Sequence, residues 1–255
     1  MPEFLVAEAK YGFNDILVMG SVLNSVDWGQ HSISLLERIN ELDSHEPVIM
    51  NIRHTERHPI TWDNNDNVLC TERGISCAKE FGSKLPEGWV YRFWHTSSPR
   101  TLETVKAIAV GLEQNGVESE IMGEPGTEFV LDNDRFVEIR NGYQVFSDGE
   151  ESAITLLSNW NKNRYPADVI TPPSEFGKGI AQDLSEKLGE RSFHILVSHD
   201  VWVAALMESW IQAHPDDWVQ CLDGFLVQLK EDHLNPILPH GKHEADYPSW
   251  WTRRQ

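Results

Sequence analysis

The sequence predicts an α/β protein with three layers, in which helices cover both faces of a central, mostly parallel β-sheet. Short apolar runs typical of buried strands alternate with longer segments of helical spacing along most of the 255 residues. Neither an internal repeat nor a linker rich in Gly, Ser and Pro divides the chain. We therefore expect a single domain that spans residues 1–255.

Five segments are predicted to be strands because they are short and rich in apolar residues. The first contains "PVIMNI", whose apolar character is typical of a strand that is buried on both faces. The predicted strands cover residues 47–52, 89–96, 117–123, 192–200 and 224–230, and residues 224–230 are expected to be the last strand of the chain.

Five other segments are predicted to be helices from apolar spacing and end signals. Thr71 is a candidate N-cap for one helix, and Ser97 or Ser98 for the next, which ends at Gly116. The predicted helices cover residues 31–42, 71–85, 98–116, 179–190 and 201–212.

Two regions are less regular than this alternation. Residues 1–45 are predicted to be an N-terminal extension that includes one helix. Residues 124–175 are rich in Pro, Gly, Asn and Asp, with one helical patch near 150–162, and are predicted to be a lid or insertion. The tail after residue 246 yields no prediction.

Composition restricts the possible partners and compartment. The formal net charge of -19 repels nucleic acid and anionic membrane surfaces, so we expect neither as a general partner. Glu3 and Glu8 stand where a signal peptide would be basic and apolar, and no apolar segment has the length of a membrane span. Three cysteines cannot all pair with one another, which favours a reducing compartment. These observations predict a cytoplasmic protein.

A metal site is not expected. The chain lacks CxxC and Cys/His zinc spacings, and the histidines near the C-terminus (His233, His240 and His243) have no standard ligand spacing. We therefore expect neither a metal nor an organic cofactor.

Polar residues follow three of the predicted strands at the point where each strand ends. They are Arg53, His54, Arg57, Arg100, His199 and Asp200. Ligands of α/β sheets bind beyond the carboxyl ends of the strands, so these side chains are expected to converge on one crevice. Trp62, Trp160 and Trp202 stand near predicted loops or strand ends and are candidates for lining a substrate pocket.

The residue types in this crevice suit phosphoryl transfer. The three arginines can hold a phosphate dianion, aided by the helix N-terminus near Arg100. A neutral His54 can attack phosphorus if a backbone carbonyl orients its other ring nitrogen. His199 would stabilise the equatorial oxygens of the transition state, and Asp200 would protonate the leaving alkoxide and then activate water.

Three segments resemble motifs of the histidine phosphatase (phosphoglycerate mutase-like) superfamily. They are "RHTER", "SSPRTLETVKAIA" and "VSHD", and the resemblance covers roughly residues 46–230. It implies that His54 is the nucleophile of a cofactor-independent phosphatase. The phosphate pocket that it implies consists of Arg53, Arg57, Arg100 and His199.

The proton donor differs between branches of this superfamily. "VSHD" resembles the acid phosphatase and phytase branch, which implies Asp200 as the donor. The mutase branch takes a glutamate from the loop after the second motif, where Glu128 stands here. Asp200 is favoured, and Glu128 is the alternative.

One residue departs from the family pattern: Thr55 stands where the family has glycine after the nucleophile. With a negative φ, Thr55 is tolerated or donates to the ligand, whereas a positive φ would strain it. The sequence therefore predicts a phosphomonoesterase for a small phosphorylated metabolite. A phosphomutase and a non-catalytic phosphate-binding protein are the alternatives, while substrate and oligomeric state are not indicated.

Overall fold

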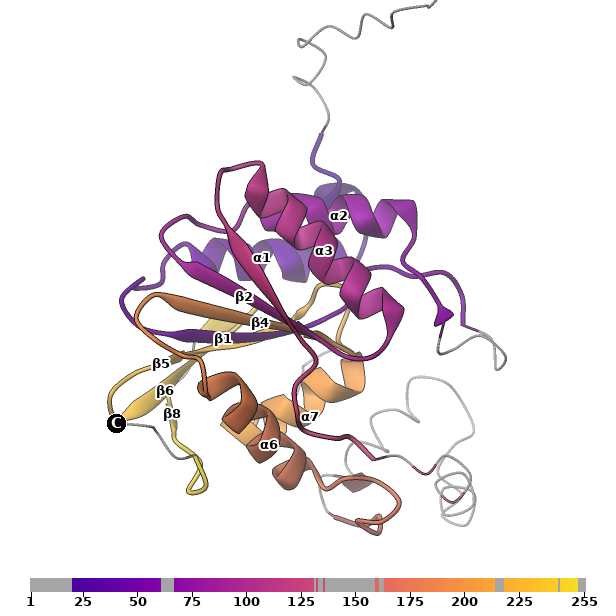
Figure 1. Cartoon of the computed structure of the whole chain (residues 1–255), viewed down its shortest axis with the longest axis vertical. Coiled ribbons are helices and arrows are strands. Elements are labelled where there is room, and N and C mark those ends of the chain that lie inside the picture. The colour runs from indigo at the N-terminus through magenta and orange to yellow at the C-terminus, as the bar shows by residue number, and fades with distance from the viewer. Residues whose placement is uncertain are drawn as a thin grey trace, which may run out of the picture.

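The structure is a computed structural model that describes residues 20–60, 67–130, 132, 135, 159–160, 163–213, 218–242 and 244–251. Within these residues the strands form one eight-stranded sheet of order β3-β2-β4-β1-β5-β6-β7, with β8 also paired to β6 (Figure 1). The strands are β1 (Val48–Arg53), β2 (Val90–His95), β3 (Ser119–Gly123), β4 (Ser192–Ser198), β5 (Gly224–Leu229), β6 (His233–Leu238), β7 (Gly241–Lys242) and β8 (Ala245–Asp246).

The described helices lie between these strands or before them. A short 3-10 helix, η1 (Leu23–Ser25), precedes α1 (Gly29–Ile39), α2 (Glu72–Ser83), α3 (Pro99–Glu113), α6 (Pro173–Ser185) and α7 (Asp200–Ile211). Thr71 caps α2 as expected, because its side chain accepts a hydrogen bond from the Gly74 N–H. No described helix is both long and apolar enough to cross a membrane.

The parallel part of the sheet consists of β3, β2, β4 and β1, and β5 joins β1 antiparallel. Arg53 at the end of β1 pairs in register with Ser198 of β4, and His95 of β2 pairs with Val197. The carboxyl ends of these three strands therefore meet at one edge of the sheet. The chain turns there into the segments that carry the candidate site.

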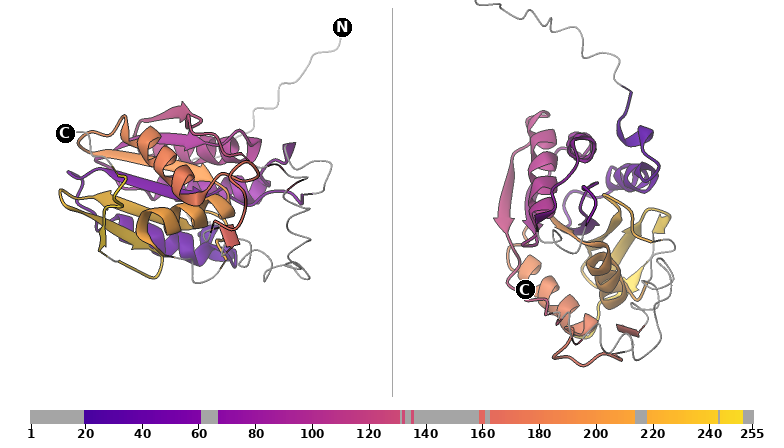
Figure 2. Two further views of the ribbon diagram at one scale, coloured as in Figure 1. Left: turned by 90° about the horizontal axis from the view of Figure 1, so that it is seen from below. Right: turned by 90° about the vertical axis from the view of Figure 1, so that its right-hand side faces the viewer.

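Helices cover both faces of the sheet, which confirms the three-layer prediction. Helices α1, α2 and α3 pack on one face in a core that includes Leu36, Phe81 and Ile108. Helices α6 and α7 pack on the other face, around Phe176 and Leu206 (Figure 2). Residues of η1 and α1, which lie within the expected N-terminal extension, belong to the first core.

Two expectations from the sequence were wrong. Residues 224–230 were expected to be the last strand, but β6, β7 and β8 follow; Pro236 in β6 and the short lengths of β7 and β8 conceal them. Helix α6 begins at Pro173 rather than near residue 179, because proline is well suited to the first turn of a helix. The helical patch expected near 150–162 lies outside the described residues except at 159–160.

Candidate active site

The ends of β1, β2 and β4 bring together the histidines and arginines that the sequence singled out. The rings of His54 and His199 lie 5.6 Å apart, edge to face. Arg100, in the first turn of α3, places Nη2 3.4 Å from Nδ1 of His199. Arg53, the last residue of β1, places Nη2 3.2 Å from Oδ2 of Asp200, the first residue of α7. Three separate segments of the chain thus meet at one point.

His54 has the geometry that a neutral nucleophile requires. It is almost completely buried, and its Nδ1 lies 2.7 Å from the carbonyl oxygen of Thr55. Because a carbonyl only accepts, Nδ1 carries the proton and Nε2 holds the free electron pair. Burial lowers the pKa of His54 to about 2, and nearby His199, Arg53 and Arg100 lower it as well. The imidazole is therefore neutral at physiological pH.

Thr55, expected among the substrate-binding residues, uses its polar groups inside the protein. Its hydroxyl donates to the carbonyl of Gly74 at 2.9 Å, and its N–H donates to Oγ1 of Thr104 at 3.1 Å. Thr55 is fully buried and is not among the described residues with a positive φ. The backbone thus accommodates threonine here without strain, and its carbonyl orients His54.

His199 is held as a neutral ring by two neighbours. Because Nη2 of Arg100 can only donate, Nδ1 of His199 is the acceptor of that contact. Its Nε2 then carries the proton and donates to Oγ1 of Thr96 at 3.0 Å. Burial lowers the pKa of His199 to about 4, with a further decrease from Arg100.

Arg57 completes the cationic side of the site. Its backbone forms an isolated β-bridge with Cys70, and its Nη1 donates to the carbonyl of His58 at 3.0 Å. Burial and the charge of Arg53 both lower the pKa of its guanidinium. Arg53, Arg57 and Arg100 therefore concentrate positive charge within a chain of formal net charge -19. Such a pocket favours a multiply charged anion.

The segment before β5 contributes contacts that the sequence did not indicate. The carbonyl of Val219 accepts from Nη1 of Arg53 at 2.6 Å, and Nε1 of Trp218 donates to Oδ2 of Asp200 at 3.1 Å. The N–H of Val201 donates to Oδ1 of Asp200 at 2.9 Å. Both oxygens of this carboxylate are thus held by donors. Neither Trp218 nor Val219 belongs to a recognisable motif, so neither could be singled out from the sequence.

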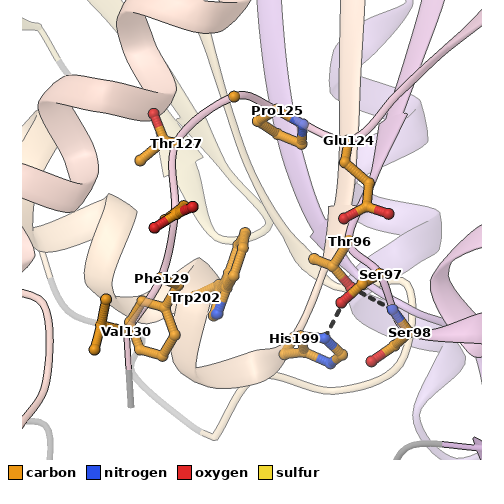
Figure 3. Close-up of a pocket in the computed structure, with 12 residues that line it drawn as sticks. Thr96, Ser97, Ser98, Glu124, Pro125, Thr127, Phe129, Val130, His199 and Trp202 are labelled. Carbon is orange, nitrogen blue, oxygen red and sulfur yellow. Dashed lines mark hydrogen bonds between the residues drawn. The ribbon is translucent and has the colours of Figure 1, made fainter.

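A cavity of about 530 Å³ opens beside His199 (Figure 3). Its described lining comes from the end of β2 and the start of α3, from the segment after β3, and from α7. The lining residues are Thr96, Ser97, Ser98, Glu124, Pro125, Gly126, Thr127, Glu128, Phe129, Val130, His199 and Trp202. Trp202, one of the three tryptophans suggested as pocket residues, lies between Phe129 and His199. Trp160 is instead buried in the core, and Trp62 lies outside the described residues. Glu128, the alternative proton donor, is also at this cavity.

Metal ligands do not cluster in the described part of the chain. No group of three or more His, Cys, Asp or Glu side chains there is arranged to hold a metal ion. The donors that converge on the site are guanidinium and imidazole groups, which suit an anion rather than a cation.

Comparison with solved structures identifies the fold. The chain is similar to a phosphoglycerate mutase from Bacillus anthracis, with a TM-score of 0.51 and 13% identity over 80% of this chain and 94% of that one. Other similar structures are YhfR of Bacillus stearothermophilus (TM-score 0.48, 14% identity, 78% and 96% covered) and a mycobacterial glucosyl-3-phosphoglycerate phosphatase (TM-score 0.43, 13% identity, 72% and 89% covered). No family model and no curated protein sequence matches the chain. The likeness to the Bacillus anthracis mutase shows that this is the phosphoglycerate mutase-like histidine phosphatase fold.

Proposed function

We propose that this chain, which has the histidine phosphatase fold, is a phosphomonoesterase that works through a phosphohistidine at His54. The observation that carries the proposal is the state of His54: a buried, neutral ring, oriented by the Thr55 carbonyl and surrounded by cationic side chains. A histidine that served only the core would not require three arginines near it. The same surroundings suit a phosphate dianion.

In the first step, the phosphate group of the substrate binds to Arg53, Arg57 and Arg100. Nε2 of His54 attacks phosphorus, and the bond from phosphorus to the ester oxygen breaks. The arginines stabilise the negative charge spread over the transferred phosphoryl group. Asp200, in its protonated form, delivers a proton to the departing alkoxide, so that a neutral alcohol leaves.

In the second step, water attacks the phosphohistidine. The Asp200 carboxylate, left by the first step, takes a proton from this water while the bond between phosphorus and Nε2 breaks. Inorganic phosphate leaves, and His54 returns to its neutral state. Acid and base are thus the same residue in turn, and the cycle requires only water as co-substrate.

Asp200 is proposed as the proton donor because of its contact with Arg53. In the structure, Oδ2 of Asp200 lies 3.2 Å from Nη2 of Arg53 and accepts a hydrogen bond from the Trp218 N–H. When a phosphate dianion binds to Arg53, the guanidinium donates to the phosphate oxygens instead of to Asp200. Asp200 then lies beside an anion rather than a cation. This exchange favours the protonated carboxyl at the moment when a proton is required. Glu128 lines the adjacent cavity without such a link to the arginines described here.

The proposal is tested with purified protein and two esters of different leaving group. Wild type should hydrolyse p-nitrophenyl phosphate, and His54→Ala should abolish this activity. Asp200→Asn should lower turnover of an alkyl phosphate by about 10²–10⁴-fold, because an alkoxide requires a proton to depart. Turnover of p-nitrophenyl phosphate should fall much less, and Glu128→Gln should show no such split.

Two outcomes would overturn parts of this proposal. A leaving-group split in Glu128→Gln, with Asp200→Asn near wild type, would transfer the acid role to Glu128. Stabilisation by phosphate or vanadate without hydrolysis of any ester would indicate a phosphate-binding protein instead.

A further inference from the structure

We infer that the cavity beside His199 is a leaving-group pocket that selects phosphate esters of cationic alcohols, such as amino alcohols, over neutral and anionic esters. This inference rests on the proposed function, because it assigns the alcohol part of the substrate whose phosphate the arginines hold. It is carried by the position, charge and aromatic wall of the cavity.

The cavity lies beside the proposed phosphate site and shares His199 with it. His199 and the residues around the start of α3 line the cavity, and they also flank Arg100. Ser98 stands at the N-cap of α3, two residues before Arg100. An alcohol attached to a phosphate that Arg100 holds therefore extends from the phosphate site into this space. The volume of about 530 Å³ accommodates a small organic group.

The charge of the cavity is opposite to that of the phosphate site. Glu124 and Glu128 contribute carboxylates to the lining, and none of the described lining residues is a lysine or arginine. Figure 3 shows the Glu124 side chain directed toward Thr96 and Ser97, on the side of the cavity near His199. A second anionic group on the substrate would be repelled here, whereas an ammonium group would be attracted.

The opposite wall of the cavity is aromatic and firmly packed. Trp202 lies 5.5 Å from Phe129 and 6.1 Å from His199, measured between ring centroids. Phe176 supports Trp202 from the core at 4.6 Å. Aromatic faces attract ammonium groups through their quadrupoles, and indole does so most strongly. Carboxylates together with an aromatic wall form a site for an organic cation.

The segment that carries the carboxylates is fixed in place. Thr127, between Glu124 and Glu128, donates to Oδ2 of Asp183 on α6 through its N–H at 2.7 Å and its hydroxyl at 2.6 Å. The N–H of Val130 donates to Oγ1 of Thr171 at 2.8 Å. This part of the lining is therefore pre-organised, which lowers the entropy cost of binding.

The test compares two esters that have the same shape but differ in charge. Phosphocholine carries a quaternary ammonium, and 3,3-dimethylbutyl phosphate replaces its nitrogen by carbon. The full chain should hydrolyse phosphocholine with a kcat/KM about tenfold or more above that of the neutral ester. Glu124→Gln should reduce this ratio to about threefold or less, because one carboxylate is neutralised. Glu113→Gln, at the exposed far end of α3, makes the same charge change and should leave the ratio unaltered.

The ratio of the two kcat/KM values tests the cationic pocket independently of the proposed function. Loss of an acid catalyst would lower the hydrolysis rates of both esters together and would leave their ratio unchanged. Equal kcat/KM for the two esters, or a ratio unaffected by Glu124→Gln, would overturn the cationic pocket while p-nitrophenyl phosphate hydrolysis continues. A preference for 3-phosphoglycerate over phosphocholine would overturn it as well. Failure to hydrolyse any ester, p-nitrophenyl phosphate included, would overturn the proposed function itself.

Discussion

Replacing Arg100 by methionine tests whether this arginine binds phosphate or only stabilises the folded protein through its charge. Arg100 is 7% exposed, and its guanidinium lies against His199 with Arg53 and Arg57 nearby. Methionine retains most of the buried stem but removes the charge. We predict a large loss of turnover with little loss of stability.

The two magnitudes follow from what the guanidinium contacts. One charged donor to the transferred phosphoryl group is worth roughly 3–4 kcal/mol in the transition state, which corresponds to about 10²–10³-fold in kcat. In the unliganded protein, removing a buried cation that faces other cations relieves repulsion and desolvation. This relief offsets the lost contacts, so the free energy of unfolding should change by about 1 kcal/mol or less.

The assay combines turnover of p-nitrophenyl phosphate with urea unfolding, with and without inorganic phosphate. At a phosphate concentration of about 100 times the wild-type Kd, wild type should gain about 2.7 kcal/mol of stability. A variant that binds about 100-fold more weakly should gain about 0.4 kcal/mol. Arg92→Met is the control, because Arg92 pairs with the exposed Glu120 and lies away from the site. Collapse of stability in Arg100→Met, with unchanged activity per folded molecule, would refute the reasoning.

Two further predictions concern the stability of the protein at acidic pH and the role of the hydrogen bond from Trp218 to Asp200. Burial lowers the pKa of His54 to about 2 and those of His194 and His199 to about 4, so near pH 5 only the unfolded chain binds these protons. The free energy of unfolding should therefore decrease as the pH is lowered below 6.5, by about 2–4 kcal/mol per pH unit near pH 5. A urea midpoint that does not change between pH 7 and pH 5 would contradict this. Trp218→Phe removes a donor that orients the Asp200 side chain, so proton delivery should be impaired and alkyl phosphate hydrolysis should slow more than p-nitrophenyl phosphate hydrolysis; equal effects on both would show that Trp218 only packs.

Strands in the core were predictable because burial on both faces leaves a continuous apolar run. Val48–Arg53 and Ser192–Ser198 are such strands, and both lie within one or two residues of their expected limits. The start of α6 was not predictable in the same way, because its prolines and glycines are typical of loops. The structure gives another reason for Gly177: a Cβ there would lie 2.1 Å from Oγ of Ser209, so glycine permits close packing of α6 on α7.

The site itself was partly predictable for a reason of topology. Residues that follow parallel strands must meet at one edge of the sheet, so motifs far apart in sequence were expected to converge. The contacts of Trp218 and Val219 with Asp200 and Arg53 depend instead on how residues 218–223, before β5, pack against the end of β1. Loop residues show no periodic pattern in the sequence, and contacts made by a backbone carbonyl do not depend on the identity of the side chain. Such contacts therefore cannot be predicted from the sequence.

Thr55 shows how a departure from a family motif is accommodated by packing. A Cβ on Gly74 would lie 2.3 Å from the carbonyl oxygen of Glu56, so the first turn of α2 approaches the loop after β1 very closely. At this short distance the Thr55 hydroxyl reaches the Gly74 carbonyl, and its side chain turns into the core. The carbonyl of Thr55, which any residue would supply, still accepts from Nδ1 of His54. The threonine therefore changes how the loop after β1 is anchored on α2. It does not change the hydrogen bond that orients the proposed nucleophile, because a backbone carbonyl supplies that bond. The departure from the family glycine is therefore compatible with turnover.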